Sequence, residues 1–349
     1  MKKLIKGNIA LCEGAITAGL ESYFGYPITP QNEILSYLSK KMVEIGKIFL
    51  QAESEIAAIN MVLGAAVTGA RSMTSSSSPG ISLKQETISY MAGMEIPALI
   101  INIQRGGPGL GNISGAQSDY FQAVKGGGHG DYKVIVLAPN SVQEMYEMAY
   151  DAFDLAEKYR TPIMLLSDGI IGQMMEPAEL NSRVKKKKNI EKDWIIDGCK
   201  GREARSIKSL LMENGALEKH NINLQKKYRV ISKNEIKYEL YMVEDSEIII
   251  VSYGISSRIA KSVTKFARKN GVKVGLLRPK TLWPFPSKII NSLAKSNVKF
   301  LAIELNHGQM IEDLKLAVNG KSSVSFLGKA GGGIITELEI FKKIQELNL

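Results

Sequence analysis

Cysteine and histidine are scarce in this sequence. Its 349 residues include two cysteines, Cys12 and Cys199, and three histidines, His129, His220 and His307. A structural zinc site needs about four ligands, and an iron–sulfur cluster needs a set of cysteine thiolates. Neither residue type has the number or spacing for such a site. The sequence therefore excludes a cluster held by this chain alone and predicts no metal site, so any electron carrier must lie on another chain.

Long hydrophobic runs are also lacking. No apolar run approaches the roughly 18–20 residues that a membrane span needs. The first residues, MKKLIKGNIALCEG, place basic side chains before an apolar stretch, but Glu13 interrupts that stretch. We therefore expect neither a membrane segment nor a signal peptide, and the cytoplasm is the default location.

Acidic residues are outnumbered, with 35 Asp and Glu against 45 Lys and Arg, which gives a net charge of +10. Much of the excess falls in residues 183–230, which hold fourteen Lys and Arg against six Asp and Glu and include the run RVKKKKN. A charge excess confined to one segment is more typical of a solvated linker than of a nucleic-acid site, and we expect no nucleic-acid partner. Anchoring to an acidic partner subunit remains open as a further interpretation.

Strand-like and helix-like segments alternate along most of the chain. Continuous apolar runs at 96–103, 133–138 and 161–168 are typical of strands buried on both faces. Between the last two, Ser141 and Glu144 form a capping box before an amphipathic helix, so the segment is a βαβ unit with a parallel sheet. A second alternating series follows, with strands expected at 247–254, 272–278, 298–304 and 323–328 and a helix closed by Gly271. The sequence therefore predicts an α/β fold of two domains, 1–175 and 246–349, joined by a basic, irregular linker at 176–245.

Three loops are rich in glycine or serine. TSSSSPG (74–80) follows GARSM, RGGPGLGN (105–112) follows the expected strand at 96–103, and KGGGHGD (125–131) precedes an expected strand. Ligands bind beyond the carboxyl ends of parallel strands, and Arg105 at such an end suits a carboxylate or phosphate. None of the loops has the spacing of a dinucleotide or P-loop motif, so ordinary turn chemistry remains the alternative.

Glu55 and Thr29 are the other candidate site residues. Glu55 begins a small, apolar segment, so its carboxyl would be partly desolvated and a candidate acid, with Glu53 as its competitor. The alternative is a helix N-terminal acid favoured by the macrodipole. Pro27 and Pro30 stiffen the backbone around Ile28 and Thr29, which presents one hydroxyl, either in a rigid turn or toward a ligand. Asp168, in SDG at 167–169, lacks the preceding glycine and the suitable downstream asparagine of a magnesium–diphosphate site.

Seven segments spread along the chain carry a family resemblance. They are FGYPITPQNE (24–33), QAESEIAAINMVLGAA (51–66), TSSSSPGISLKQE (74–86), INIQRGGPGLGN (101–112), KGGGHGDY (125–132), LLRPKTLWPFP (276–286) and IELNHGQM (303–310). In this order they resemble the α subunit of 2-oxoacid:ferredoxin oxidoreductases, and most closely the type acting on 3-methyl-2-oxobutanoate (2-ketoisovalerate). The resemblance covers nearly the whole chain and weakens around 180–240. It implies a pyrimidine-type thiamine-diphosphate domain with a parallel sheet, followed by an α/β domain like the C-terminal domain of transketolase.

The resemblance assigns roles to individual residues. Glu55, rather than Glu53, would hydrogen-bond the aminopyrimidine ring of thiamine diphosphate. Pro27, Ile28 and Thr29 would lie beside the cofactor, with the Thr29 hydroxyl facing the substrate. Arg105 would bind the substrate carboxylate.

The resemblance also implies partners and cofactors. A β subunit would bind the diphosphate, Mg²⁺ and a [4Fe-4S] cluster, so that thiamine diphosphate is shared between the chains. Gamma or delta subunits, ferredoxin as electron acceptor and coenzyme A as co-substrate would complete the reaction, which turns a 2-oxoacid into acyl-CoA and CO₂. Three alternatives remain: a 2-oxoglutarate enzyme, since Lys84 or Lys125 could hold a second carboxylate; a non-catalytic structural subunit; and a complete thiamine enzyme with another acceptor.

Overall fold

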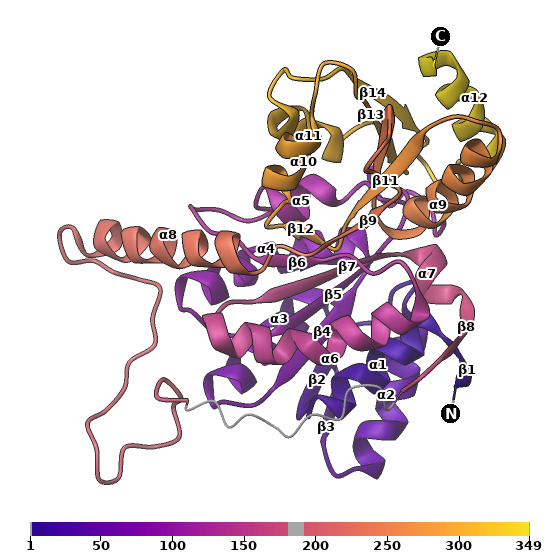
Figure 1. The fold of residues 1–349 in the computed structure, drawn as a ribbon. Helices are drawn as coiled ribbons and strands as arrows, with labels where there is room; N and C mark the ends of the chain where they lie inside the picture. Colours follow the sequence, from indigo (N-terminus) through magenta and orange to yellow (C-terminus); the bar gives the residue numbers. More distant parts are fainter. Residues whose placement is uncertain (1, 181–191, 349) are drawn as a thin grey trace.

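Two mostly parallel β-sheets form the framework of the protein (Figure 1). The computed structural model describes residues 2–180 and 192–348. The first sheet has seven strands in the order β12-β6-β7-β5-β4-β2-β3, and every neighbouring pair is parallel except β12 with β6. Its strands are β2 (Ser22–Gly25), β3 (Ile48–Gln51), β4 (Ser72–Ser76), β5 (Leu99–Gln104), β6 (Ile135–Leu137), β7 (Ile163–Asp168) and β12 (Thr281–Trp283).

Helices cover both faces of the first sheet. Helices α1, α2 and α6 pack on one face, and α3 and α4 pack on the other (Figure 1). This arrangement explains why β5 and β7 are continuous apolar runs, since each is buried along its whole length. The helices are α1 (Gly7–Thr17), α2 (Asn32–Glu44), α3 (Glu55–Val67), α4 (Ser78–Gly93), α5 (Tyr120–Val124), α6 (Val142–Tyr159) and α7 (Gly169–Gln173).

The second sheet has the order β14-β13-β10-β11-β9, with β9 antiparallel to β11. A separate antiparallel pair joins β1 (Lys3–Lys6) to β8 (Met175–Ala178). The strands of the second sheet are β9 (Tyr238–Tyr241), β10 (Ile248–Ser252), β11 (Val274–Pro279), β13 (Lys299–Glu304) and β14 (Val324–Gly328). Its helices are α9 (Gly254–Lys269), α10 (Ser287–Leu293), α11 (Met310–Val318) and α12 (Glu337–Asn348).

The predicted strands and helices of both series are confirmed. The capping residue of α6 is Ser141, whose Oγ accepts a hydrogen bond from the backbone N–H of Glu144 at 3.1 Å. Helix α9 ends at Lys269, and Gly271 follows with a φ of +80°, a conformation that glycine adopts without strain. Among the described residues, no helix has both the length and the apolar character needed to cross a bilayer.

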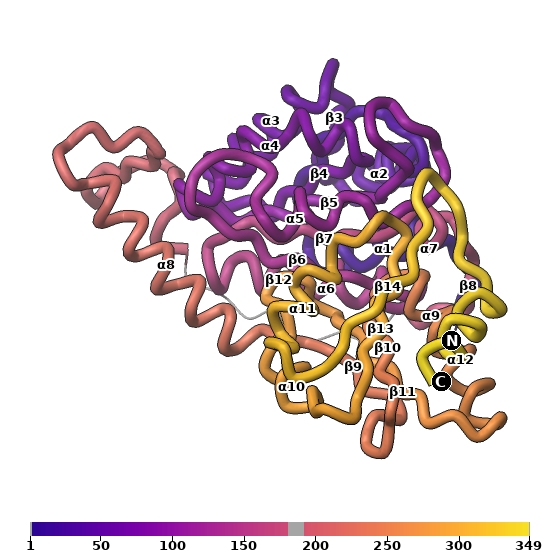
Figure 2. The backbone as a smooth tube through the Cα atoms, turned by 90° about the horizontal axis from the view of Figure 1, so that it is seen from above, coloured from indigo at the N-terminus to yellow at the C-terminus, as the bar shows by residue number. Residues whose placement is uncertain are grey.

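The segment 176–245 is more ordered than the sequence predicted. The run RVKKKKN (183–189) lies outside the described residues, but helix α8 (Ala216–Asn234) follows it and lies along one side of the molecule (Figure 2). Its buried residues, Leu224, Tyr228 and Ile231, share one helix face, and the Tyr228 ring packs edge-on against Trp283. The prediction of an irregular linker was therefore wrong here, because the dense charges obscured that spacing.

The proposed boundary near residue 245 is crossed in both directions by strands. Strand β9, before it, joins the second sheet, and β12, beyond it, joins the first sheet. The domain boundaries at 175 and 245 thus remain a prediction, because each sheet includes one strand from the other side of residue 245.

Gln117, in the loop that follows β5, forms hydrogen bonds to the second sheet and its first helix. Its Nε2 donates to the carbonyl of Tyr253 at 2.8 Å, and its Oε1 accepts from Ser256 Oγ at 2.8 Å and from the N–H of Leu305 at 2.9 Å. Asp168, at the end of β7, accepts a further bond from the N–H of Ile255 at 2.9 Å. The second sheet is therefore fixed against the loops that follow the strands of the first.

Arg278 provides a buried ionic link between the same two layers. Both of its terminal nitrogens lie 2.7 Å from the carboxylate oxygens of Glu144 on α6, and Nη2 also lies 2.9 Å from Glu239 on β9. Burial would raise the pKa of Glu144, but the hydrogen bonds and charge of Arg278, assisted by Lys280, hold it at about 2 instead of 4.5. Glu144 therefore stays ionised to a lower pH in the folded protein than in the unfolded chain.

We expect Arg278→Met to lower the free energy of unfolding by about 1.5–3 kcal/mol, because it removes the charged hydrogen bonds of Arg278 and leaves the partly buried Glu144 carboxylate paired with Lys280 alone among the described residues. A depressed folded-state pKa stabilises the fold above the unfolded pKa, so the difference from wild type should shrink as pH falls from about 5 to 2. Urea unfolding of both proteins at several pH values in this range measures the difference in stability. Lys273→Met, which breaks the exposed pair with Glu247, is the control and should change stability by less than about 1 kcal/mol. Equal effects of the two substitutions would contradict the account.

Candidate functional site

Four loops meet at one edge of the first sheet. Strands β3, β2, β4 and β5 are neighbours and run parallel, so the loops that follow them lie at the same edge. Thr29 follows β2, Glu55 follows β3, Ser77 follows β4 and Arg105 follows β5. The parallel order thereby brings the three candidate residues from distant parts of the sequence to one edge.

Glu55 is a buried carboxyl at the first position of α3. Its residue is 8% exposed, whereas Glu53 is exposed, so the structure separates the two competing glutamates. Ser54 caps the helix by accepting a bond from the N–H of Ala57 at 3.1 Å. A helix N-terminal acid that served only the macrodipole could remain in water, so the burial of Glu55 favours a role toward a ligand.

Gly80 allows the Glu55 carboxyl to lie against the first turn of α4. A Cβ atom at Gly80 would fall 2.7 Å from Oε1 of Glu55 and 2.0 Å from Oγ of Ser76. Both distances are shorter than a carbon–oxygen contact, so any larger residue at position 80 would force the side chains of Glu55 and Ser76 to move. The serine-rich loop is therefore a site where backbone and side chains pack unusually closely, rather than a simple turn.

Three buried polar atoms at this edge lack a partner among the described residues. They are Oγ of Ser76, Oγ of Ser77 and Nε of Arg105. Buried donors and acceptors are normally paired, because leaving one unsatisfied costs about 1–3 kcal/mol. All three belong to residues at or just after the ends of the neighbouring strands β4 and β5, where a polar ligand could supply partners.

The loop that carries Thr29 is anchored by the residues after it. Gln31 is fully buried and accepts a bond from Ser75 Oγ at 2.5 Å, and the carbonyl of Pro30 accepts from Asn8 at 3.0 Å and Gln173 at 2.7 Å. Oγ1 of Thr29 accepts from Nδ2 of Asn32 at 3.2 Å. Because that bond uses a lone pair, the hydroxyl proton of Thr29 remains able to donate to a ligand.

Arg105 and Thr29 are in direct contact. Nη1 of Arg105 donates to the carbonyl oxygen of Thr29 at 3.0 Å, and Nη2 donates to the carbonyl oxygen of Leu110 at 3.0 Å. These two bonds use two of the five N–H groups of the guanidinium, and Nε is unpaired. Arg105 is therefore held in place by the backbone with donors left for a carboxylate.

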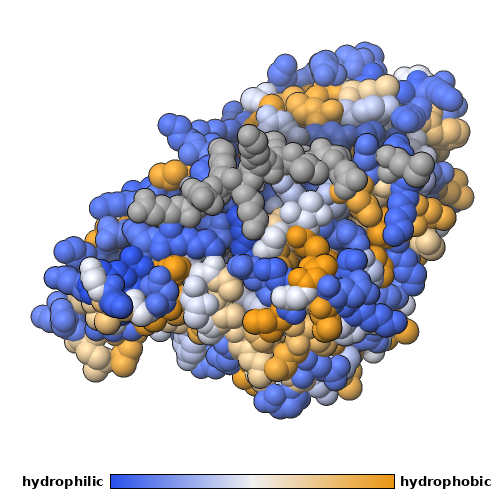
Figure 3. All heavy atoms as spheres, turned by 90° about the horizontal axis from the view of Figure 1, so that it is seen from below, coloured by the Kyte–Doolittle hydropathy of each residue, from blue (hydrophilic) through white to orange (hydrophobic). Residues whose placement is uncertain are grey.

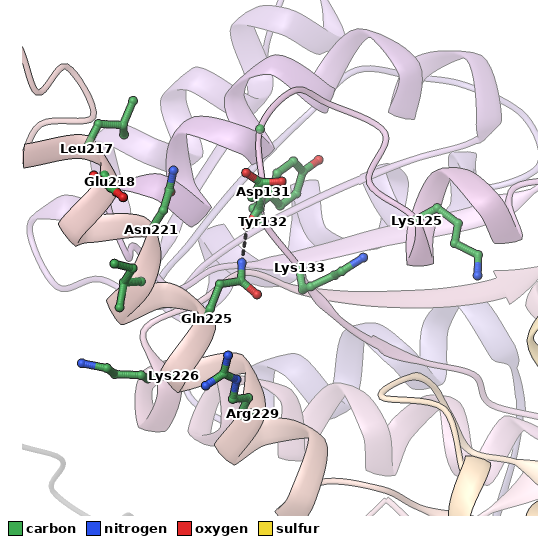
Figure 4. Close-up of a pocket in the computed structure, with 12 residues that line it drawn as sticks. Lys125, Asp131, Tyr132, Lys133, Leu217, Glu218, Asn221, Gln225, Lys226 and Arg229 are labelled. Carbon is green, nitrogen blue, oxygen red and sulfur yellow. Dashed lines mark hydrogen bonds between the residues drawn. The ribbon is translucent and has the colours of Figure 1, made fainter. Parts of the chain in front are cut away.

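Of the remaining loops, one joins this site and one does not. Residues 105–115 form a closed loop, in which Asn112 donates from its N–H to Gly106 and from Nδ2 to the carbonyl of Gly331 beyond β14. Lys125 and residues 130–133 instead line a cavity of about 780 Å³ against α8, where Gln225 donates to the carbonyl of Asp131 (Figure 4). The two ends of the KGGGHGD loop thus face a different cavity, and Lys125 forms an ion pair with Asp313.

Asp168, the acid of the SDG segment, has structural partners. Its Oδ1 accepts from the N–H of Ile171 at 3.0 Å and its Oδ2 from the N–H of Ile255. Burial raises its pKa to about 6, although these backbone bonds oppose the shift. Within the described ranges, no group of three or more His, Cys, Asp or Glu is placed to hold a metal ion.

Sequence reasoning missed two residues that shape the site. Gln31 was read only as part of the proline loop, and Lys84 was considered only as a cation for a second substrate carboxylate. The structure buries Lys84 completely, with Nζ 3.2 Å from the carbonyl oxygen of Glu55 and 3.0 Å from Thr74 Oγ1. The sequence does contain a signal for the burial of Lys84, since it lies between the apolar positions Ile81 and Ile88 of a helix.

Known proteins match this chain over almost its whole length. Residues 13–244 match the family described as pyruvate flavodoxin/ferredoxin oxidoreductase, thiamine-diphosphate-binding, and residues 246–340 match the pyruvate:ferredoxin oxidoreductase core domain II. Ketoisovalerate oxidoreductase subunit VorB of Methanothermobacter marburgensis is 50% identical over 345 residues, covering 99% of this chain and 97% of the relative. The 2-oxoglutarate synthase subunit KorA of Methanothermobacter thermautotrophicus is 36% identical, covering 99% and 98%.

A solved structure shares the arrangement. The 2-oxoglutarate:ferredoxin oxidoreductase of Magnetococcus marinus, with 2-oxoglutarate, coenzyme A and succinyl-CoA bound, matches with a TM-score of 0.88 and 26% identity. The match covers 99% of this chain and 65% of that chain, so this chain spans about two-thirds of its length. Together with the family match, it confirms the predicted α/β fold with a thiamine-diphosphate-binding domain.

Gly80→Ala tests the close packing around Glu55. The added methyl group would collide with Glu55 and Ser76, so we expect the free energy of unfolding to fall by about 1–3 kcal/mol. Gly64→Ala on α3 is the matched control, since its Cβ meets nothing within 4 Å, and it should stabilise the protein by up to about 1 kcal/mol. Chemical unfolding of both variants is the measurement. A neutral Gly80→Ala substitution would show that the contact is not close.

Proposed function

This chain belongs to the thiamine-diphosphate-binding family of pyruvate flavodoxin/ferredoxin oxidoreductases, and on that premise we propose that it forms half of the active site of 3-methyl-2-oxobutanoate:ferredoxin oxidoreductase. Enzymes of this family are thiamine-diphosphate-dependent oxidoreductases of 2-oxoacids. The observation that carries the proposal is the meeting of Glu55, Thr29 and Arg105 at one sheet edge, with Arg105 bonded to the Thr29 carbonyl.

The residues at this edge fit the pyrimidine part of thiamine diphosphate. Glu55 offers a buried carboxyl, Ser76 offers an unpaired hydroxyl beside it, and Pro27 and Ile28 offer apolar surface on the adjoining loop. When bound, thiamine diphosphate would supply a carbon nucleophile for the 2-oxo group and a thiazolium ring that takes up the electron pair released by decarboxylation. Glu55 would share a proton with the pyrimidine ring nitrogen, a bond that its burial strengthens.

Arg105 and Thr29 would act on the substrate. The free Nε–H and the remaining terminal N–H groups of Arg105 would hold the carboxylate of the 2-oxoacid, and the carbonyls of Thr29 and Leu110 orient them. The Thr29 hydroxyl would donate to the substrate oxygen as charge develops there. A donor of this kind is worth about 3–4 kcal/mol in the transition state.

The surroundings of Arg105 favour a substrate with an apolar side chain. A 2-oxoglutarate enzyme needs a second cation, but Lys84 is buried beneath Glu55 and Lys125 pairs with Asp313 beside another cavity. Leu110, whose carbonyl Arg105 holds, is 81% exposed and apolar. The 50% identity to a ketoisovalerate subunit, against 36% to a 2-oxoglutarate subunit, supports the same choice.

The proposed enzyme is a cytoplasmic complex of several subunits. The named relatives are themselves subunits, and the two cysteines of this chain cannot hold a cluster. We therefore assign the diphosphate site, Mg²⁺ and a [4Fe-4S] cluster to a β subunit, with gamma or delta subunits, ferredoxin and coenzyme A completing the reaction. Apolar patches lie among the polar residues of the face in Figure 3, and edge strand β3 exposes Ile48 (58%) and Leu50 (42%), as a partner surface would.

Thr29→Val separates catalysis from a purely structural role of the subunit. Valine keeps the size of threonine and removes the donor, so we expect kcat of the purified complex to fall about 100- to 1,000-fold while the complex still assembles. Thr68→Val, which removes an exposed hydroxyl at the end of α3, is the control and should leave kcat unchanged. Full activity of Thr29→Val, or loss of assembly as its main effect, would favour the scaffold alternative.

The substrate choice is tested by kinetics of the same complex. We expect kcat/KM for 3-methyl-2-oxobutanoate to exceed that for 2-oxoglutarate by at least about 100-fold, because the distal carboxylate would lie in apolar surroundings without a partner. The isolated chain supplied with thiamine diphosphate and ferredoxin should turn over neither substrate. A preference for 2-oxoglutarate would overturn the assignment of substrate but not of family.

A further inference from the structure

Lys84 is a buried lysine to which no carboxylate of the described residues is bonded. It lies in α4, is fully buried, and directs its Nζ to two neutral oxygens, the carbonyl of Glu55 at 3.2 Å and Oγ1 of Thr74 at 3.0 Å. Among the described ion pairs, none includes Lys84, and Glu55 supplies the charge that acts on it. Lysine is almost never fully buried unless it is paired.

Burying this ammonium is unfavourable for the fold. Removing a charge from water costs several kcal/mol, and two neutral acceptors recover only part of that cost. Burial accordingly lowers the pKa of Lys84 to about 7, and the negative charge of Glu55 opposes the shift. A methionine would fill a similar volume among Ile81 and Ile88 without this cost. Stability alone therefore does not account for a lysine here.

The position of Lys84 connects it to the site. Gly80 and Lys84 are four residues apart and so lie on the same face of α4. Gly80 admits the carboxyl of Glu55, and Lys84 bonds the backbone carbonyl of the same residue. Thr74, the other partner, lies on β4 two residues before Ser76, whose hydroxyl is unpaired beside Glu55. Lys84 thus joins the start of α3, the end of β4 and the first turns of α4.

We propose that Lys84 is a positioning residue that holds the first turn of α3 so that the Glu55 carboxyl points at the pyrimidine ring of the cofactor. This inference rests on the proposed function. Without the ammonium, the Glu55 carbonyl loses its bond to α4, and the carboxyl loses the positive charge beneath it. A displacement of about 1 Å in such a group can cost about 100-fold in rate.

Lys84→Met in the purified complex, stripped of cofactor and titrated with thiamine diphosphate and Mg²⁺, tests the inference. We expect the dissociation constant for thiamine diphosphate, measured by calorimetry, to rise about tenfold or more. In the reloaded complex kcat should fall by at least the same factor, while KM for the 2-oxoacid stays near the wild-type value, because Arg105 is untouched.

Lys227→Met is the matched control. Lys227 is another largely buried lysine, on α8, which bonds Glu95 at 2.9 Å and the carbonyl of Arg160 at 3.0 Å, away from the sheet edge. Its loss should lower stability without changing cofactor affinity or kcat. An equal loss of affinity in both variants would show a general effect of removing a buried lysine and overturn the inference.

The remaining outcomes are also decisive. Wild-type affinity and kcat in Lys84→Met would overturn the role of Lys84 while leaving the proposed function intact. A wild-type complex that does not bind thiamine diphosphate would overturn the proposed function itself. If the methionine variant does not assemble, Lys84→Gln, which keeps a donor but not the charge or the reach, should show the same rise in the dissociation constant, and wild-type affinity in it would contradict the proposal.

Discussion

The site depends on a carboxyl group buried at the first turn of a helix. Glu55 follows β3, enters α3 at its first position and lies against Gly80 at the start of α4. A carboxyl in this position loses hydration, and the chain compensates with the positive end of α4 and with Lys84. Glycine at 80 leaves room for this contact, so the serine–glycine loop and the glutamate pack as one unit. Oγ of Ser76 in this unit has no hydrogen-bond partner among the described residues.

The part of the candidate site around Arg105 is arranged in a comparable way. Its guanidinium bonds the carbonyls of Thr29 and Leu110, so two loops from different strands are fixed around one group of donors. Gln117 and Asp168 then secure the second sheet against the same region. The second layer thereby restricts movement of the loop 105–115, to which it is joined through Asn112. A preorganised arrangement of this kind is what acts on charge that develops during a reaction.

Part of this arrangement could be predicted from the sequence. The continuous apolar run before Arg105 indicates a buried parallel strand, whose following loop lies at the ligand-binding edge of the sheet. The strands before Thr29 and Glu55 have only four residues each and were not predicted, so these residues were expected beside Arg105 only from the resemblance to 2-oxoacid:ferredoxin oxidoreductases. The contacts of Gly80 and Lys84 with Glu55 could not be predicted, since they depend on how two helices pack. Helix α8 was missed because charges obscured its apolar spacing, and β12 was missed because three residues carry little pattern.

We propose that the buried Glu55 carboxyl controls the proton on the cofactor. Hydrogen–deuterium exchange at the thiazolium C2 of bound thiamine diphosphate, measured by NMR in the complex without 2-oxoacid, tests it most directly. Glu55→Gln should slow this exchange by about 100-fold or more, and Glu53→Gln, at the exposed neighbour, should leave it unchanged. Exchange at the wild-type rate in Glu55→Gln, with cofactor bound, would contradict the account.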